Sequence, residues 1–572
     1  MFTKNYRNRQ KKAVQFSIGW FAILQLLILL SACQRDPGPI PIAPTNVPAG
    51  EQSIITIGDD AIEDSGLFLP LLYEVSDLTA QVEPGVPPQF VGSLPQPLTT
   101  NNDERQRSGQ VTLQIGKSNL VGQWVYAAVA PFPSPIKTLS SIDLSALWLD
   151  ESGPNLGPLV MDPDTYATFT AFLGPAAPDA VVLLQPEDIP GYAWTFPPSV
   201  AIIPFEQLAP LWKVLPIDGH SPIAPDFNAA SYPLTIPISI SGDPVFIDLF
   251  KETFLTDQTL HSNRRADRLT TLALTGVTAM ARATAYTMEI QGVTYPAQDI
   301  APWLLEADIT HVSNEVPFAP NCPFPNPVQA AAVFCSSDRY IELLEAIGTD
   351  IVELSGDHFQ DWGREAMIHT LDLYTANNIP YYGGGINATD ASRPLLIEHN
   401  GNRLAFIGCN AKGGPYAQAS ESSPGAVLCD FEAIEIQIHG LVEQGYLPIV
   451  TFQHQEHYTY APHPAQQRDF RRVAEAGAVI VSGSQAHQPQ GMEFYGAEKR
   501  FIHYGLGNLF FDQYDYCFAC RQGTVDRHIF YNGRHIQTEL LPYIFIDYAR
   551  PRPMTPAESD QLFNALFTAS GW

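Results

Sequence analysis

Charged residues are scarce in this sequence, and most of them are acidic. Asp, Glu, Lys and Arg make up 16% of the 572 residues, against about 25% in typical soluble proteins. Only 31 residues are Lys or Arg while 60 are Asp or Glu, which gives a formal net charge of −29. Binding to nucleic acid needs a basic surface, so this balance argues against a nucleic-acid partner.

Long apolar runs are also rare. Only one, over residues 13–30, has the length of a membrane-spanning segment, which excludes a polytopic membrane protein. Hydrophobic residues nevertheless make up 45% of the chain, which excludes wholesale disorder. The 50 prolines disfavour coiled coils and helical solenoids. We therefore expect several compact domains with many rigid loops.

The one apolar run is typical of an export signal. Five basic residues and no acidic residue precede it, and it ends in Leu-Ser-Ala-Cys at 30–33. This pattern predicts a signal peptide over residues 1–32. The last four residues resemble the bacterial lipobox, which implies lipidation of Cys33. An uncleaved membrane anchor is the alternative, and both interpretations place the remaining chain outside the cytoplasmic membrane.

A proline-rich segment follows and leads into two globular regions. Residues 33–52 lack hydrophobic periodicity and predict a stiff, lipid-anchored tether. The predicted globular regions are residues 53–242 and 266–572.

Six cysteines remain after Cys33, and six cysteines allow fifteen pairings. Pairing between sequence neighbours is the simplest expectation, and export favours disulfides. The expected pairs are Cys322–Cys335, Cys409–Cys429 and Cys517–Cys520. The last pair forms a C-x-x-C motif, for which a redox or zinc role is the alternative, although no second C-x-x-C would complete a zinc site.

The region 53–242 contains short strand-like runs between Pro, Gly and Asp loops. Examples are QVTLQIG at 110–116, AVVLLQP at 180–186 and SVAIIPF at 199–205. They predict an α/β module. The stretches 125–152 and 200–241 resemble type 2 periplasmic substrate-binding proteins, which implies a module that binds a small solute.

The region 266–572 alternates strand-like and helix-like segments, which predicts a layered α/β domain. Polar residues directly follow four of its strands, and ligand-binding groups of open α/β sheets collect at that edge. Imidazole and carboxylate ligands suit Mn, Fe or Zn, and a bound ion would activate water or polarise a phosphoryl or acyl group. The strand-end residues are Asn314, Glu315, His358, His454 and His487.

Several motifs of this region occur in a characteristic order. They are ADITHVSNEVPF at 307–318, SGDHFQDWG at 355–363, FQHQEHY at 452–458, GSQAHQPQGMEFY at 483–495 and YGLGNLFFDQ at 504–513. Together they resemble the CapA family, which is linked to poly-γ-glutamate capsules and belongs to the calcineurin-like metallophosphoesterase superfamily. The resemblance covers residues 270–512 and implies an α/β/β/α sandwich preceded by the smaller module.

The resemblance also implies roles for individual residues. The implied metal ligands are Glu315, His358, His454 and His487. The implied catalytic residues are His358, Asp357, Arg282 and Asn314. His358 would act as general acid or as ligand, and Asp357 would replace a lost carboxylate. Arg282 would bind an anionic substrate or pair with an acid, and Asp361 would belong to the site or cap a helix.

Two departures from the family pattern affect the metal. Val277 stands where the family has Asp, and Gln485 stands where it has His. Val cannot bind a metal and Gln is a weak ligand, so we expect at most one divalent ion.

Two functions are compatible with these observations. The first is a cell-surface lipoprotein that acts on poly-γ-glutamate or a related anionic polymer by metal-assisted hydrolysis or transfer. The second is a non-catalytic extracytoplasmic protein that binds a solute or polymer and keeps a degenerate metallophosphoesterase fold. Because the chain is acidic, binding an anionic polymer would need a local cationic cleft or a bridging metal.

Overall fold

The computed structural model describes residues 78–94, 99–100, 110–150, 156–255, 259–414 and 417–572. The predicted signal peptide, Cys33 and the tether lie outside these residues, as do residues 53–77 of the predicted first module. The described residues belong to one compact unit. Among the described residues, no helix combines the length and hydropathy needed to cross a membrane.

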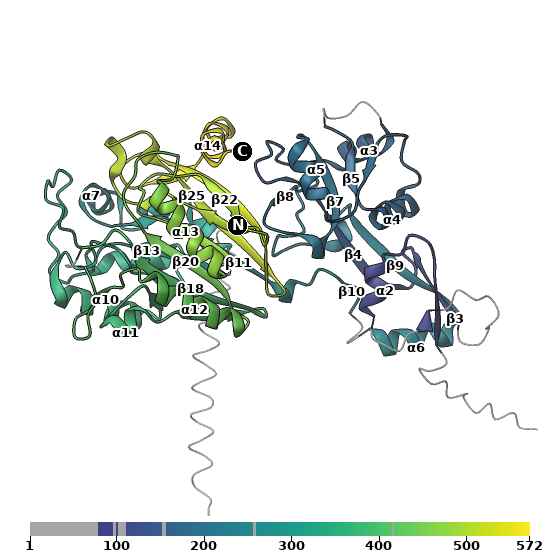
Figure 1. The fold of residues 1–572 in the computed structure, drawn as a ribbon, viewed down its shortest axis with the longest axis horizontal. Helices are drawn as coiled ribbons and strands as arrows, with labels where there is room; N and C mark the ends of the chain where they lie inside the picture. Colours follow the sequence, from purple (N-terminus) through teal and green to yellow (C-terminus); the bar gives the residue numbers. More distant parts are fainter. Residues whose placement is uncertain (1–77, 95–98, 101–109, 151–155, 256–258, 415–416) are drawn as a thin grey trace, which may run out of the picture. The chain divides into compact units, whose positions relative to one another are not determined.

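The first part of the described chain forms a ten-stranded mixed sheet (Figure 1). Eight strands follow the order β2 (Thr99–Thr100), β1 (Thr79–Val82), β3 (Gln110–Ile115), β9 (Thr235–Gly242), β4 (Leu120–Pro131), β7 (Val200–Pro204), β5 (Leu159–Met161) and β6 (Val181–Leu183). Strands β8 (Trp212–Val214) and β10 (His261–Ser262) pair with β4. The helices are α2 (Pro88–Ser93), α3 (Ser141–Leu149), α4 (Pro163–Leu173), α5 (Ile189–Thr195) and α6 (Pro244–Phe254).

Local sequence explains why these elements form. Strand β4 is apolar and buried over most of its length because it lies in the middle of the sheet. Helix α3 begins with a capping box between Ser140 and Asp143, and the Asp162 side chain caps α4 just before Pro163.

The second part of the chain contains two larger sheets. The nine-stranded sheet has the order β15 (Tyr381–Tyr382), β14 (Ile351–Glu353), β13 (Ile309–Asn314), β11 (Leu269–Leu274), β25 (Gln522–Tyr531), β26 (Arg534–Phe545) and β27 (Pro551–Pro553), with β12 (Val277–Thr278) and β24 (Asn508–Phe510) beside it. The six-stranded sheet has the order β17 (Leu395–His399), β18 (Asn402–Asn410), β20 (Leu447–Gln453), β21 (Ile480–Gly483), β23 (Arg500–His503) and β22 (Met492–Tyr495). A small sheet joins β16 (Gly384–Gly385) and β19 (Gly425–Ala426).

These two sheets pack face to face and carry helices on their outer faces. Leu272 and Leu274 of β11 share one buried core with Phe406 of β18 and Ile449 of β20. Ala273, on the opposite face of β11, belongs to the core under α7 (Arg282–Gln291), α8 (Ala301–Leu305), α9 (Ile341–Ala346) and α10 (Gly363–Ala376). Helices α12 (Phe431–Glu443) and α13 (Pro464–Ala476) cover the six-stranded sheet. The expected α/β/β/α sandwich is confirmed.

The remaining helices are α11 (Ala388–Ala391) and α14 (Pro556–Ser570). Within the segment 298–308, only α8 is helical. Pro296 and Pro302 both lie at the start of short helical turns, where a missing backbone N–H is tolerated.

All three expected disulfides are present: Cys322–Cys335, Cys409–Cys429 and Cys517–Cys520. The C-x-x-C motif is therefore a disulfide and leaves no thiolate pair for zinc in this state. Three disulfides fit an exported protein, since such bonds persist in oxidising compartments.

Candidate metal and acid–base site

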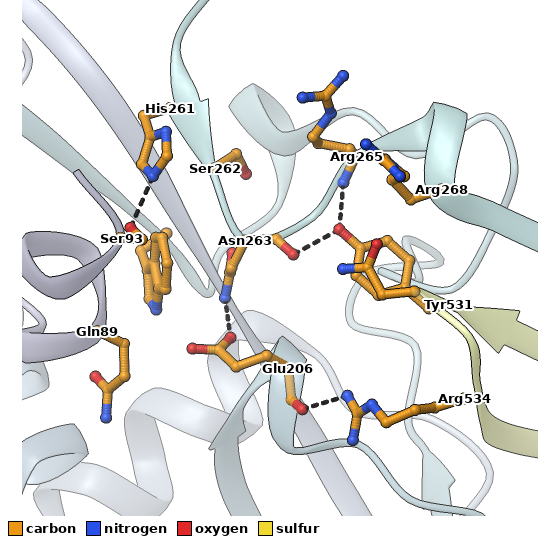
Figure 2. Close-up of a pocket in the computed structure, with 12 residues that line it drawn as sticks. Gln89, Ser93, Glu206, His261, Ser262, Asn263, Arg265, Arg268, Tyr531 and Arg534 are labelled. Carbon is orange, nitrogen blue, oxygen red and sulfur yellow. Dashed lines mark hydrogen bonds between the residues drawn. The ribbon is translucent and has the colours of Figure 1, made fainter. Parts of the chain in front are cut away.

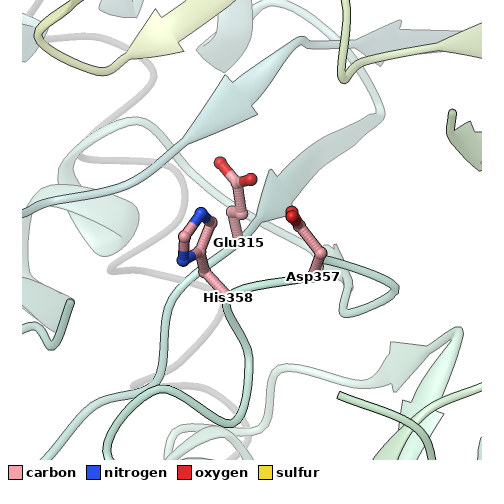
Figure 3. Close-up of side chains that lie close together, drawn as sticks. All are labelled: Glu315, Asp357 and His358. Atoms are coloured by element: carbon pink, nitrogen blue, oxygen red, sulfur yellow. The ribbon is translucent and has the colours of Figure 1, made fainter. Parts of the chain in front are cut away.

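Three predicted site residues meet at one edge of the nine-stranded sheet. Glu315 directly follows β13, and Asp357 and His358 lie in the loop after β14, which runs parallel to β13. The carboxyl ends of parallel neighbours lie at the same edge, so the topology brings these loops together. One ligand atom from each of Glu315, Asp357 and His358 lies within 4.8 Å of the others (Figure 3).

Gly356 permits this close approach of the two loops. A Cβ atom at position 356 would lie 2.7 Å from the Cα of Glu315 and 2.9 Å from its carbonyl oxygen. Real Cβ atoms do not approach backbone so closely, so only glycine lets Asp357 and His358 lie against Glu315.

The two carboxyl groups differ in protonation because they share one site. Burial, together with the charge of Asp357, raises the pKa of Glu315 to about 8. Burial would also raise the pKa of Asp357, but hydrogen bonding with Glu315 and the charges of His358 and Lys412 lower it below its usual value. The pair therefore favours a protonated Glu315 beside an ionised Asp357.

His358 is oriented by a carboxylate outside the cluster. Its Nδ1 lies 2.6 Å from Oδ2 of Asp361. Burial lowers the pKa of His358, but the bond to Asp361 and the charges of Glu315 and Asp357 outweigh it and raise the pKa to about 9. The alternative role of Asp361 as a helix cap is wrong, because α10 begins at Gly363 with Trp362 at the N-cap position.

The six-stranded sheet contributes polar groups to the same place. Nε2 of Gln485 donates to Oε1 of Glu315 at 3.2 Å and to Oδ1 of Asp357 at 3.3 Å. Nζ of Lys412 lies 2.6 Å from Oδ2 of Asp357 and 2.5 Å from Oε1 of Glu456. Sequence reasoning missed Lys412, although it follows strand β18 by two residues and so obeys the rule that found the others.

His454 and His487 are buried near strand ends but do not belong to the three-residue group. Nε2 of His454 lies 3.0 Å from Oδ2 of Asp469, and its Nδ1 has no hydrogen-bond partner. Nδ1 of His487 lies 2.8 Å from Oδ1 of Asn508. Burial lowers the pKa of both imidazoles, which favours the neutral form that binds metals. Their role as ligands stays a prediction.

His487 and Arg282 share an uncommon backbone conformation. Their φ angles are +55° and +44°, whereas most of the other non-glycine residues with positive φ in the described chain are Asn or Asp. Such backbone strain tends to occur at functional sites. The strain therefore agrees with a functional role for these two residues.

Arg282 and Asn314 are held by protein partners. The Arg282 guanidinium pairs with Asp512 at 2.5 Å and lies over the rings of Phe334 and Phe511. This is the acid-pairing alternative of the sequence analysis. Asn314 is fully buried and donates from Nδ2 to the Val316 carbonyl at 2.8 Å, while its Oδ1 has no hydrogen-bond partner.

The cluster offers donor atoms that suit a divalent ion. Oε2 of Glu315 is buried without a hydrogen-bond partner, and carboxylate and imidazole donors suit Mn, Fe or Zn. The family's other carboxylate position holds Val277, which lies in a buried apolar cluster. Gln485 already binds both carboxyl groups through its amide. Within the described part of the chain, Glu315, Asp357 and His358 have ligand atoms close enough together to hold a metal ion.

A separate pocket of about 520 Å³ gathers arginines (Figure 2). Arg265, Arg268 and Arg534 line it together with Trp124 and Glu206. Arg534 donates to the Glu206 carbonyl at 2.6 Å, and Arg265 pairs with Asp267. In a chain with so few basic residues, three guanidinium groups around one pocket form a local cationic surface.

Comparison with known proteins agrees with the motifs. The family model described as bacterial capsule synthesis protein PGA_cap matches residues 271–513. The capsule biosynthesis protein CapA of Bacillus anthracis is 24% identical over 306 residues, which is 51% of this chain and 71% of that protein. The PGA biosynthesis protein CapA of Bacillus subtilis is 26% identical over 200 residues, which is 33% of this chain and 52% of that protein.

Two solved structures each resemble a portion of this chain. A phosphatase from Mycoplasma pneumoniae covers 49% of this chain and 95% of its own, with 12% identity and a TM-score of 0.31. An ABC-type phosphate transport receptor from Vibrio cholerae covers 30% of this chain and 93% of its own, with 11% identity and a TM-score of 0.24. These scores are too low to support a functional inference. The match of the PGA_cap family model to residues 271–513 confirms the resemblance that the motifs of this region carry.

Proposed function

We propose that this protein acts outside the cytoplasmic membrane in the synthesis or anchoring of poly-γ-glutamate or a related anionic polymer. In this proposal Cys33 carries the lipid anchor, and the chemistry is metal-assisted hydrolysis or transfer. The observation that carries it is the convergence of Glu315, Asp357 and His358 inside the segment that matches the capsule family.

The residues of the site have complementary tasks. Glu315, Asp357 and His358 would hold one divalent ion, which when bound supplies Lewis-acid activation of water or of an acyl or phosphoryl oxygen. The bond to Asp361 leaves the other ring nitrogen of His358 free either to bind the ion or to give a proton to a leaving group. Buried Asn314 would hold the backbone that positions Glu315.

Anionic polymer needs a cationic surface on this acidic protein. The pocket lined by Arg265, Arg268 and Arg534 supplies one, because guanidinium groups bind carboxylates in a bidentate manner. Its aromatic side chains, Trp124 and Tyr531, would contact the apolar methylene groups of the polymer. We assign the polymer-binding role to this pocket.

The test uses the full-length purified protein and defined poly-γ-glutamate. Chain length is followed by gel filtration and new amino termini by amine labelling, with Mn²⁺ or Zn²⁺ added, and a phosphoester panel is run alongside. We expect turnover by the wild type, loss with Glu315→Gln, and retention with Glu353→Gln, a buried carboxylate of the neighbouring strand. Metal-loaded protein that changes no polymer and no phosphoester would contradict the catalytic proposal.

A second candidate is a non-catalytic binding protein. The specific observation in its favour is that Lys412 and Gln485 already bind the carboxyl groups of the site. Three results together would favour this candidate. The protein shows no turnover, it binds the polymer tightly even with Glu315→Gln, and the double variant Arg268→Ala with Arg534→Ala loses this binding.

A further inference from the structure

Both oxygens of the Asp357 carboxylate are already bound by the protein itself. Oδ2 lies 2.6 Å from Nζ of Lys412, and Oδ1 accepts a hydrogen bond from Gln485 at 3.3 Å. The Asp357 side chain is only 2% exposed, so solvent does not screen these contacts. A divalent ion that approaches Asp357 thus meets an ammonium group bound to the same oxygen.

The carboxyl group of Glu315, by contrast, has one oxygen that the protein does not bind. Its Oε1 accepts from Gln485, but its Oε2 is buried and has no hydrogen-bond partner. Once Glu315 is ionised, this oxygen is a buried acceptor without a donor, which is costly and marks Oε2 as the atom ready for a ligand. The two carboxyl groups of the cluster therefore differ: one is open to an ion and the other is occupied by lysine.

Lys412 has a second partner to which it can remain attached. Its ammonium group also lies 2.5 Å from Oε1 of Glu456, and the lysine side chain is 27% exposed. An ammonium group carries three donors on a flexible stem. Lys412 can accordingly release Asp357 and keep its ion pair with Glu456. The release breaks one contact and does not leave the ammonium group without a partner.

We infer that Lys412 is a built-in cation that competes with a divalent ion for Asp357 and so sets the metal affinity of the site. Two like charges beside one buried carboxylate repel each other strongly, so ion and ammonium exclude one another. The inference rests on the proposed function only in that the site is taken to bind a metal. In this inference Lys412 acts on the metal site through Asp357 and does not contact the reacting atoms.

The test compares Mn²⁺ binding to full-length protein by calorimetry and by the electron paramagnetic resonance of free Mn²⁺. Lys412→Met keeps the length of the side chain and removes its charge, so we expect binding at least about tenfold tighter than in the wild type. Lys137→Met is the matched control, because it removes a similar pair, 2.7 Å from Asp560, away from the cluster. We expect the wild-type affinity for this control.

A second variant gives the opposite sign. Glu456→Gln takes away the alternative partner of Lys412 and leaves the ammonium to Asp357, so Mn²⁺ should bind several-fold more weakly than in the wild type. Unchanged affinity in both Lys412→Met and Glu456→Gln would overturn the inference and leave the proposed function standing. Absence of Mn²⁺ binding in the wild type and in both variants would overturn the inference and the metal-assisted proposal together. Binding only in Lys412→Met would support the inference and count against metal assistance in the natural protein.

Discussion

Oδ2 of Asp361 accepts from His358 at 2.6 Å and also from the backbone N–H of Phe334 at 2.9 Å. The aspartate is thereby fixed by the backbone and in turn fixes the imidazole. Carboxylates outside a metal or acid–base site commonly orient its histidines in this way. Asp361, the second Asp of the sequence motif SGDHFQDWG, therefore positions the imidazole of His358.

Asp361→Asn should lower the pKa of His358 from about 9, because the amide loses the negative charge that favours the imidazolium. Histidine NMR titration measures this pKa directly. Asp338→Asn is the control, since it alters another His–Asp pair, with His369 at 2.9 Å, outside the cluster. A His358 pKa that stays near 9 in Asp361→Asn would refute the assignment.

The same shift predicts how stability depends on pH. The pKa of His358 is raised on folding, from about 6.5 in an unfolded chain. Its contribution to stability is therefore complete below about pH 6.5 and is lost as the pH rises through about 9. The difference in unfolding free energy between wild type and His358→Gln should shrink over that range, as measured by denaturant titration.

Gly356→Ala should destabilise the protein and separate the two loops of the site. The added methyl group would lie 2.7 Å from the Cα of Glu315, and overpacking of this kind costs about 1–3 kcal/mol. Gly191→Ala is the matched control, because it lies within helix α5 and the added group would meet no atom within 4 Å beyond its own helix backbone and chain neighbours. Equal stability of the two variants would contradict the close-approach argument.

The predicted metal ligands can be ranked by their contacts. Glu315→Gln and His358→Ala should lower bound metal most, since both residues belong to the converging group. His454→Ala and His487→Ala should each lower bound metal less, with little effect on folding, because neither residue belongs to that group. Plasma mass spectrometry of dialysed protein gives the metal content. Full occupancy in Glu315→Gln would show that the ion lies elsewhere.

The disulfides should stabilise the fold more where the loops they close are longer. Cys409–Cys429 spans 20 residues and Cys517–Cys520 spans 3. Replacing the first pair by Ala should lower the unfolding free energy by about 3 kcal/mol in the chain-entropy model, and replacing the second by less. Denaturant unfolding checks both, and peptide mass spectrometry without reduction checks the pairing.

The anchor has its own prediction. Cys33→Ala should leave unprocessed or released protein, because the lipid needs the thiol. Cell fractionation and incorporation of labelled fatty acid measure this. Unchanged membrane retention together with unchanged labelling would rule out the lipoprotein proposal.

The sequence alone predicted most of the layered fold and named the three residues that converge at the sheet edge. Strand-end placement identified Glu315 and His358 because residues after parallel strands must meet at one edge. The disulfides followed from proximity along the chain. These inferences need only local pattern and a known topology, so the tertiary structure was not required to make them.

Only the tertiary structure decided which donor groups compete for the carboxyl groups of the site. The competing donors of the cluster, Lys412 and Gln485, come from the second sheet, 97 and 170 positions after Glu315. No local pattern fixes which side chains of two packed sheets meet. The packing of the two sheets sets the distance between the Lys412 and Gln485 side chains and the carboxyl groups. Only the folded chain therefore shows that an ammonium group and an amide bind the carboxylates that the motifs predicted for a metal.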